Sequence, residues 1–234
     1  MNWLGLAGML LGIAAIIIGN IAEGGITSAL INGPAFIIVF GGTFAAVMVQ
    51  TPFDMIKHAF LRTFWLIIPP RFDLDDLLET LCQWGQAARK EGLMGLEKIA
   101  DVEPTPLAKK GLNLLADGQT PIAIRNSLEM DLYKQEDKGL QSAHVYESLG
   151  GYAPTIGILG AVLGLMQVLG TLDDPSLIGP GIATAFVATI YGVGSANLFF
   201  LPMAQRLKHV VQSEYLYHEL IIEGLVAIAE GEHP

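Results

Sequence analysis

Basic residues are missing from two long stretches of this chain. The 13 Lys and Arg residues lie either between residues 57 and 138 or at Arg206 and Lys208. None occurs in residues 1–56 or 139–205, and these two stretches are also the most apolar parts of the sequence. Because loops that stay in the cytoplasm are enriched in Lys and Arg, this distribution is typical of hydrophobic hairpins that cross a bilayer with their basic flanks inside.

Charged residues of either sign are also few. Only 15% of the 234 residues are charged, 52% are hydrophobic, and the mean hydropathy is +0.49. An ordinary soluble domain of this length is less apolar, so the composition predicts an integral membrane protein. The net charge of −10 indicates neither a cationic nor a nucleic-acid partner, because most acidic residues share the central segment with the basic ones, as on a solvated helical surface.

Cysteine is nearly absent. Cys82 is the single one, so no internal disulfide forms, and the sequence contains no Cys/His pattern of a zinc site. A phosphate-binding glycine loop and a nucleophile-base pair are missing as well. We therefore expect no catalytic site, no metal site and no cofactor.

Four apolar segments are long enough to cross the hydrocarbon core as helices, which takes about 20 residues. The turns within the two pairs contain no Lys or Arg and are expected to face outward. No short basic region precedes the first segment, so we interpret it as a retained span and not as a signal peptide. The expected spans are Trp3–Asn20, Pro34–Gln50, Leu149–Leu169 and Ile178–Leu201.

This pattern predicts an all-α membrane protein, with four transmembrane helices in two hairpins and a large helical cytoplasmic domain between helices 2 and 3. Both termini then lie in the cytoplasm. The expected divisions are a hairpin over residues 1–50, a cytoplasmic domain over 51–148, a second hairpin over 149–203 and a cytoplasmic tail over 204–234.

Local signals divide the middle segment into helices. Asp73 is placed to cap a helix whose apolar residues recur at helical spacing. Pro104 and Pro106 interrupt the helical pattern. Thr120 followed by Pro121 marks another helix start, and no breaker follows before the third span. One long helix is therefore expected to continue from there into the membrane.

Glycines recur at helical intervals in the first and third spans. Small residues at this spacing let helix backbones approach closely. The pattern leaves open whether these faces pack within one subunit or between subunits. The glycines are Gly5, Gly8 and Gly12 in the first span and Gly157, Gly160 and Gly164 in the third.

The expected spans contain no Asp, Glu, Lys, Arg or His. A protein that moves protons unaided is expected to have a titratable group at membrane depth, so here a partner would have to supply it. Two prolines, Pro154 and Pro202, lie near the inner ends of the last two spans. Each leaves a backbone carbonyl without its helical donor and favours a hinge or a polar notch.

Two segments of these spans resemble the flagellar motor stator family, within the wider group of MotA, TolQ and ExbB proton-channel proteins. They read APTIGILGAVLGL from Ala153 and GIATAFVATIYG from Gly181. The resemblance implies a pentameric homo-oligomer in the cell inner membrane, around a single-span MotB-like partner whose membrane aspartate takes up and releases the coupling ion. It also implies no enzymatic activity.

The same resemblance implies roles for particular residues of the ion pathway. Pro154 and Pro202 match the two family prolines that couple ion passage to conformational change. Thr189 matches the threonine that faces the partner's aspartate. Ala161 stands where sodium-driven relatives have a threonine, which favours H⁺ over Na⁺ as the coupling ion; Thr155 is the alternative source of a hydroxyl oxygen.

For the cytoplasmic domain, the resemblance implies contacts with the rotor protein FliG. Arg89 and Glu97 match the charges that meet the rotor, and neighbouring Lys90 is a further candidate. On residue chemistry alone these are ordinary exposed charges on helices.

Two other functions compete with the stator interpretation. A TolQ- or ExbB-like energiser of envelope or uptake machinery uses the same partner chemistry, but such proteins typically have three spans and an outward N-terminus. The hairpin before Lys57 argues against that branch. A secondary transporter is disfavoured because the first hairpin has almost no polar residue at depth.

Overall fold

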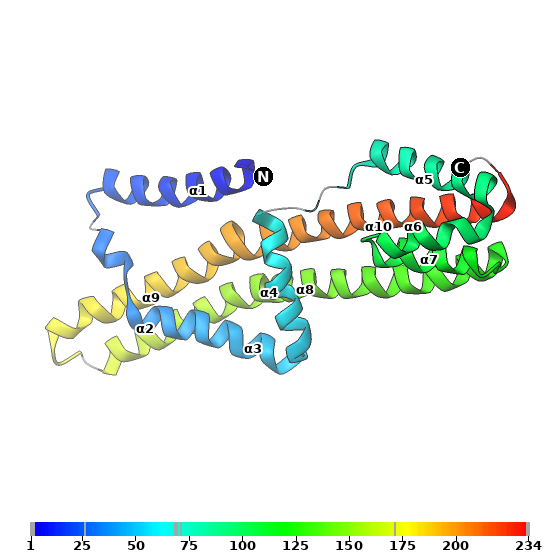
Figure 1. Ribbon diagram of the computed structural model, residues 1–234. Coiled ribbons are helices and arrows are strands. Elements are labelled where there is room, and N and C mark those ends of the chain that lie inside the picture. The colour runs from blue at the N-terminus through cyan, green and yellow to red at the C-terminus, as the bar shows by residue number, and fades with distance from the viewer. Residues whose placement is uncertain (1–2, 26, 68–69, 71, 171, 233–234) are drawn as a thin grey trace. The chain divides into compact units, whose positions relative to one another are not determined.

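Helices make up all the regular structure in the described part of the chain. The computed structural model describes residues 3–25, 27–67, 70, 72–170 and 172–232 (Figure 1). No strand occurs in these ranges, so the prediction of an all-helical fold is confirmed. The chain divides into two compact units, one of residues 1–69 with 141–208 and the other of 70–140 with 209–234.

The first unit contains the apolar helices. After α1 come a short 3₁₀ turn at Thr27–Leu30 and a helix, Gly33–Gln50, whose middle part, Ile37–Gly41, is π-helical. The α-helices that belong wholly to this unit are α1 (Trp3–Ala22), α2 (Gly33–Phe36), α3 (Gly42–Gln50), α4 (Phe53–Ile67) and α9 (Pro175–Ser195).

Three described stretches are long and apolar enough to cross a membrane: Thr27–Gln50, Pro121–Gly170 and Ile178–Glu230. A shorter apolar helix covers Ala7–Ala22. The three long stretches contain the second, third and fourth spans expected from the sequence, and the shorter helix overlaps the first.

Helix α8 runs without interruption over the 50 residues Pro121–Gly170. Its start is fixed as predicted, because Thr120 Oγ1 accepts a hydrogen bond from the backbone N–H of Ala123 at 3.3 Å and Pro121 is the first helical residue. At 1.5 Å per residue the helix is about 75 Å long. The predicted continuation into the third span is therefore confirmed.

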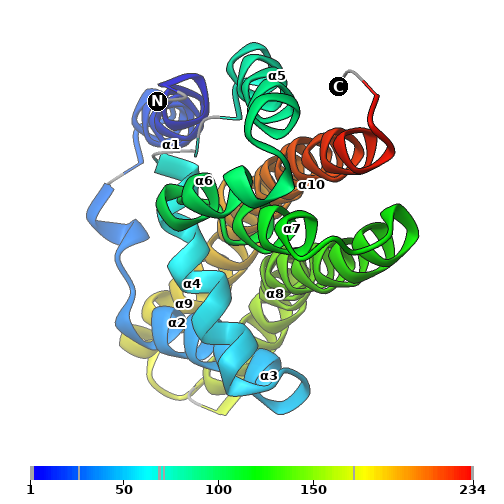
Figure 2. The ribbon, with the colours of Figure 1, turned by 45° about the vertical axis from the view of Figure 1, so that its right-hand side comes forward.

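The second unit is a bundle of amphipathic helices: α5 (Leu74–Glu91), α6 (Leu96–Val102), α7 (Pro106–Ala116) and the adjoining parts of α8 and α10 (Leu201–Glu230). The predicted cap at Asp73 is confirmed, since its carboxylate accepts hydrogen bonds from the backbone N–H groups of Asp75 and Asp76. Helix α6 ends before Pro104 and α7 begins at Pro106, and the two helices pack on each other (Figure 2). Their core is formed by Leu96, Leu112, Ile124, Leu128 and Leu225.

A buried histidine lies between α8 and α10 in this unit. His218 is 7% exposed, and its Nδ1 has no hydrogen-bond partner among the described residues. Burial lowers the pKa of His218 below its ordinary value of 6.5, while the nearby carboxylate of Glu214 partly opposes this effect. Glu214 is itself buried and accepts a hydrogen bond from Gln135 Nε2 at 2.6 Å.

We expect His218 to make the fold less stable as the pH falls below 6.5. In that range the unfolded chain binds a proton at this histidine more readily than the folded chain does. The stabilising contribution of neutral His218 is therefore fully present above the pKa of the unfolded state. It decreases, by up to about 1.4 kcal/mol per pH unit, as the pH falls toward the lowered pKa of the folded state. Thermal unfolding of the detergent-solubilised protein between pH 8 and about pH 5 measures this slope. His218→Phe should flatten it. Equal slopes for His218→Phe and the wild type would contradict the assignment.

Candidate functional site

The α8–α9 hairpin is held together by direct contact between two helix backbones. A Cβ at Gly157 would lie 2.9 Å from the carbonyl oxygen of Ala188 and 3.1 Å from Gly192 Cα. A Cβ at Gly192 would lie 2.5 Å from the carbonyl oxygen of Ala153. Such distances leave no room for a side chain, so both positions require glycine.

The same contact continues along α8. A Cβ at Gly164 would lie 2.9 Å from the backbone nitrogen of Ala185 and 2.9 Å from the carbonyl oxygen of Gly181. At Gly160 it would lie 2.8 Å from Ala188 Cβ. The question that the sequence left open is thus answered for the third span: these glycines pack within one chain.

Thr189 lies on this glycine seam. Its Cα would be 3.5 Å from a Cβ at Gly157, and its side chain is half-buried. The hydroxyl donates a hydrogen bond to the carbonyl oxygen of Ala185 at 3.3 Å, one turn back in the same helix. The packing thus places the threonine that sequence reasoning selected directly beside the third span.

The other ion-pathway candidates are more widely distributed. Pro154 is half-buried inside α8, in the turn that packs on Gly192, and does not end the helix. Thr155 is exposed and donates a hydrogen bond to the carbonyl oxygen of Tyr152 at 2.8 Å. Ala161 is half-buried in the following turns of α8.

Pro202 follows a local change of helix type. Residues Ala196–Phe200 form a π-helical turn between α9 and α10, and the N–H of Leu201 bonds to the carbonyl oxygen of Ala196, five residues earlier. Proline has no N–H, and its ring crowds the carbonyl four residues before it, which here is that of Leu198. A widened turn directly before the proline relieves this crowding while the helix continues.

A polar cluster joins the second span to the fourth. Asn32 caps α2 by accepting the N–H of Ala35 at 2.9 Å, and its Nδ2 donates to Thr184 Oγ1 at 2.9 Å. The hydroxyl of Tyr191 accepts the backbone N–H of Asn32 at 3.2 Å and donates to the carbonyl oxygen of Leu30 at 2.6 Å. Sequence reasoning did not single out Asn32, although an asparagine two residues before Pro34 is a helix-start signal.

An ion pair joins α8 and α10 just outside the expected spans. Lys208 Nζ donates a hydrogen bond to Glu147 Oε1 at 2.6 Å, and His144 lies 3.3 Å from the other oxygen. The hydrogen bond from Lys208 holds the pKa of Glu147 below its ordinary value, and that from His144 adds to the effect. The carboxyl group therefore stays ionised at neutral pH.

The candidate rotor-contact residues all belong to the second unit and all are exposed. Arg89 and Lys90 lie in the last turn of α5, and Glu97 lies in the first turn of α6. A cavity of about 310 Å³ beside Arg89 is lined by the end of α5 and by the C-terminal residues Ile228–Glu232. In the described ranges, no group of three His, Cys, Asp or Glu side chains is placed to hold a metal ion.

Comparisons with known proteins agree with this architecture. Residues 99–219 match the family model of the MotA/TolQ/ExbB proton channel family. The chain is 34% identical to motility protein A of Bacillus subtilis over 233 residues, which cover 98% of this chain and 85% of that protein. Among solved structures, that of C. jejuni MotAB superimposes with a TM-score of 0.92 at 28% identity, covering 99% of this chain and 91% of the matched chain.

The structure of the flagellar MotAB stator complex from Bacillus subtilis gives a TM-score of 0.85 at 33% identity, over 98% of this chain and 90% of the matched one. Agreement in sequence and in fold over nearly the whole length supports a single family assignment. The chain belongs to the MotA/TolQ/ExbB proton channel family, which is a family of channels and not of enzymes.

Proposed function

We propose that this chain is a subunit of a flagellar motor stator, which conducts ions across the inner membrane with a MotB-like partner and converts the flow into torque on the rotor. The observation that supports this most is the agreement with the C. jejuni MotAB structure over 99% of the chain. The family relationship alone would also admit TolQ- and ExbB-like energisers, but the relatives from Bacillus subtilis and Aquifex aeolicus that match nearly the whole chain are named motility protein A.

The proposed topology has four spans, with α1 as the first, and places both termini and residues 51–148 in the cytoplasm. The absence of Lys and Arg from residues 1–56 and 139–205 supports this orientation. Helix α1 has 20 residues, which is enough to cross the hydrocarbon core. The tail of residues 204–234, which includes most of α10, then lies in the cytoplasm.

The proposed ion step takes place on the partner's membrane aspartate, because the expected spans of this chain contain no titratable group. Thr189 on the glycine seam faces that aspartate. Protonation removes the negative charge and its constraint, and the inner halves of the last two spans, with hinges at Pro154 and Pro202, change conformation. Ala161 offers no oxygen to a sodium ion, so the coupling ion is a proton, and Thr155 is the alternative source of a hydroxyl oxygen.

The proposed torque step uses the exposed charges of the second unit. Arg89, Glu97 and Lys90 meet the rotor protein FliG, and the cavity beside Arg89 gives a rotor side chain a place to insert. The chain acts as a ring of copies, proposed to be a pentamer, around the partner.

Deleting the gene, together with any second set of stator genes, is expected to give cells that have normal flagellar filaments but do not swim. Filament assembly does not need the stator, whereas torque does. The measurement is swimming speed with filament counts in parallel, and the wild-type gene should restore motility. Normal swimming combined with an envelope or nutrient-uptake defect would reject the stator function and place the chain with the TolQ and ExbB energisers.

A further inference from the structure

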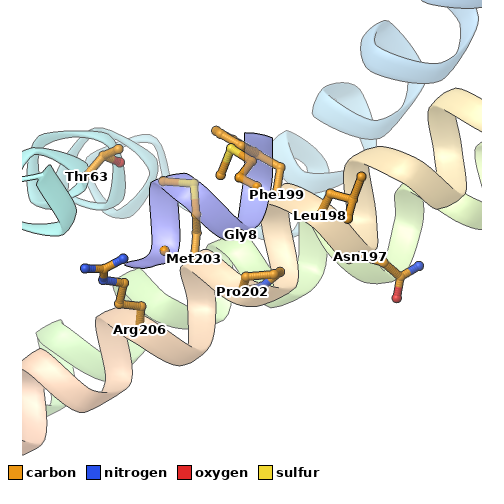
Figure 3. A pocket seen from close by; sticks show the side chains of 10 residues that line it. Gly8, Thr63, Asn197, Leu198, Phe199, Pro202, Met203 and Arg206 are labelled. Atoms are coloured by element: carbon orange, nitrogen blue, oxygen red, sulfur yellow. The ribbon is translucent and has the colours of Figure 1, made fainter. Parts of the chain in front are cut away.

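An apolar groove runs along the first unit between α1 and residues 197–206, which belong to the π-helical turn and the start of α10. Its volume is about 610 Å³. Figure 3 shows the guanidinium of Arg206 at one end of the groove and Asn197 at the other, with Leu198, Phe199 and Pro202 between them. Gly8 and Met9 of α1 form part of the opposite wall. Arg206 is the one charged residue among the described residues that line the groove.

Two glycines of α1 make room for the Arg206 guanidinium and keep the groove open. A Cβ at Gly5 would overlap Nη1 of Arg206, so this glycine lets the guanidinium lie against α1. A Cβ at Gly8 would have no atom within 4 Å, so the groove is open at this point. The groove is thus apolar along its length and has a positive charge at one end.

The dimensions and the lining fit a lipid. The distance along the helix from Asn197 to Arg206 is about 14 Å, close to the thickness of one leaflet of a hydrocarbon core of about 30 Å. The walls between these two residues are apolar, as an acyl chain requires, and the single charge at one end suits a headgroup.

We infer that this groove binds one anionic phospholipid of the inner leaflet, with an acyl chain along Gly8, Met9, Leu198 and Phe199 and the phosphate at Arg206. Under the proposed orientation, Arg206 lies at the cytoplasmic end of the fourth span, where basic pockets between helices bind anionic headgroups. The guanidinium provides paired N–H donors for phosphate oxygens. The lipid fills the space between α1 and α10 and couples the position of α1 to the segment that contains Pro202.

Native mass spectrometry of the full complex tests this inference with phosphatidylglycerol and, in parallel, with phosphatidylcholine. The wild type is expected to retain phosphatidylglycerol preferentially. Gly8→Leu fills the open part of the groove and should abolish retention. Arg206→Gln should lower the preference for phosphatidylglycerol about fivefold, because one basic residue near a headgroup contributes about 1 kcal/mol.

Gly19→Leu is the matched control, because Gly19 lies in the same helix, also has no atom within 4 Å of its Cβ position, and does not line the groove. It should bind lipid like the wild type. Equal retention by wild type and Gly8→Leu, or equal retention of the two lipids by the wild type, would overturn the inference.

A photoreactive amino acid at position 8 identifies the occupant directly. A phospholipid adduct supports the inference, whereas an adduct with a second copy of the chain or with the partner overturns it. None of these measurements depends on motility, so a failure of the lipid site is distinguishable from a failure of the proposed stator function.

Discussion

Replacing Pro202 with alanine is expected to abolish swimming while the protein still accumulates and assembles in the membrane. Alanine restores an N–H that can bond to the carbonyl of Leu198 and removes the ring that crowds this carbonyl. The ring then no longer holds the π-helical turn Ala196–Phe200 open, and the added hydrogen bond makes the segment stiffer while the packing of α9 and α10 keeps its register. Torque on tethered cells should fall to the level of the deletion strain, and Pro154→Ala should act in the same direction.

Pro180 provides the control for this experiment. Pro180 lies inside α9, as Pro202 lies inside α10, but it is far from the π-helical turn. Its carbonyl oxygen accepts a hydrogen bond from the hydroxyl of Thr184 at 3.0 Å. Pro180→Ala should leave swimming near the wild-type level. Membrane quantity and complex size, measured by immunoblot and gel filtration, separate a coupling defect from a folding defect. Loss of assembly in both Pro154→Ala and Pro202→Ala would make the two prolines structural and contradict the proposed hinge.

The second large effect is expected from Gly192→Val, which should prevent formation of a stable α8–α9 hairpin. The valine Cβ would lie 2.5 Å from the carbonyl oxygen of Ala153 and 3.0 Å from Gly157 Cα. Both are backbone atoms of a regular helix, so they cannot move aside as a side chain can by changing its rotamer. The two helices must therefore separate along the seam. Overpacking typically costs about 1–3 kcal/mol, and here it also removes the adjacent close contacts.

Gly194→Val is the matched comparison, since it lies two residues away in the same helix and has no atom within 4 Å of its Cβ position. The intrinsic cost of valine in a helix is the same at both sites and cancels. The quantities to compare are the yield and the thermal unfolding midpoint of the assembled complex. If Gly194→Val proved as disruptive as Gly192→Val, the close backbone contact would not be the cause.

The parts of the fold that the sequence predicted correctly are those governed by neighbouring residues. The caps at Asp73 and Thr120 and the break between Pro104 and Pro106 depend on interactions over a few positions. The uninterrupted course of α8 up to the membrane follows from the lack of a breaker between Pro121 and the third span. Pro154 was expected to bend that helix, but the structure shows only that α8 continues through it.

The features that sequence reasoning missed depend on distant partners. In the sequence alone, Asn32 has the pattern of a helix cap. In the structure its Nδ2 also donates a hydrogen bond to Thr184, 152 residues away. The π-helical turn before Pro202 reflects a compromise between proline sterics and the packing of both flanking helices, which local propensity does not encode. The functional roles of Ala161 and Thr189 came from the family resemblance and not from residue chemistry, because a threonine bonded to its own helix is common in membrane spans.

The π-helical turn Ala196–Phe200 has a consequence for how the length of this protein can change in evolution. Such a turn contains one residue more than the α-helix around it, and in an α-helix one residue corresponds to a rotation of about 100°. Losing a residue within this turn would restore a regular helix and keep the buried face of α10, including Ala204 and Leu207, in register with α9. The same loss elsewhere in α9 or α10 would turn that face away from the core, so within these two helices this turn is the position where the loss of one codon costs least.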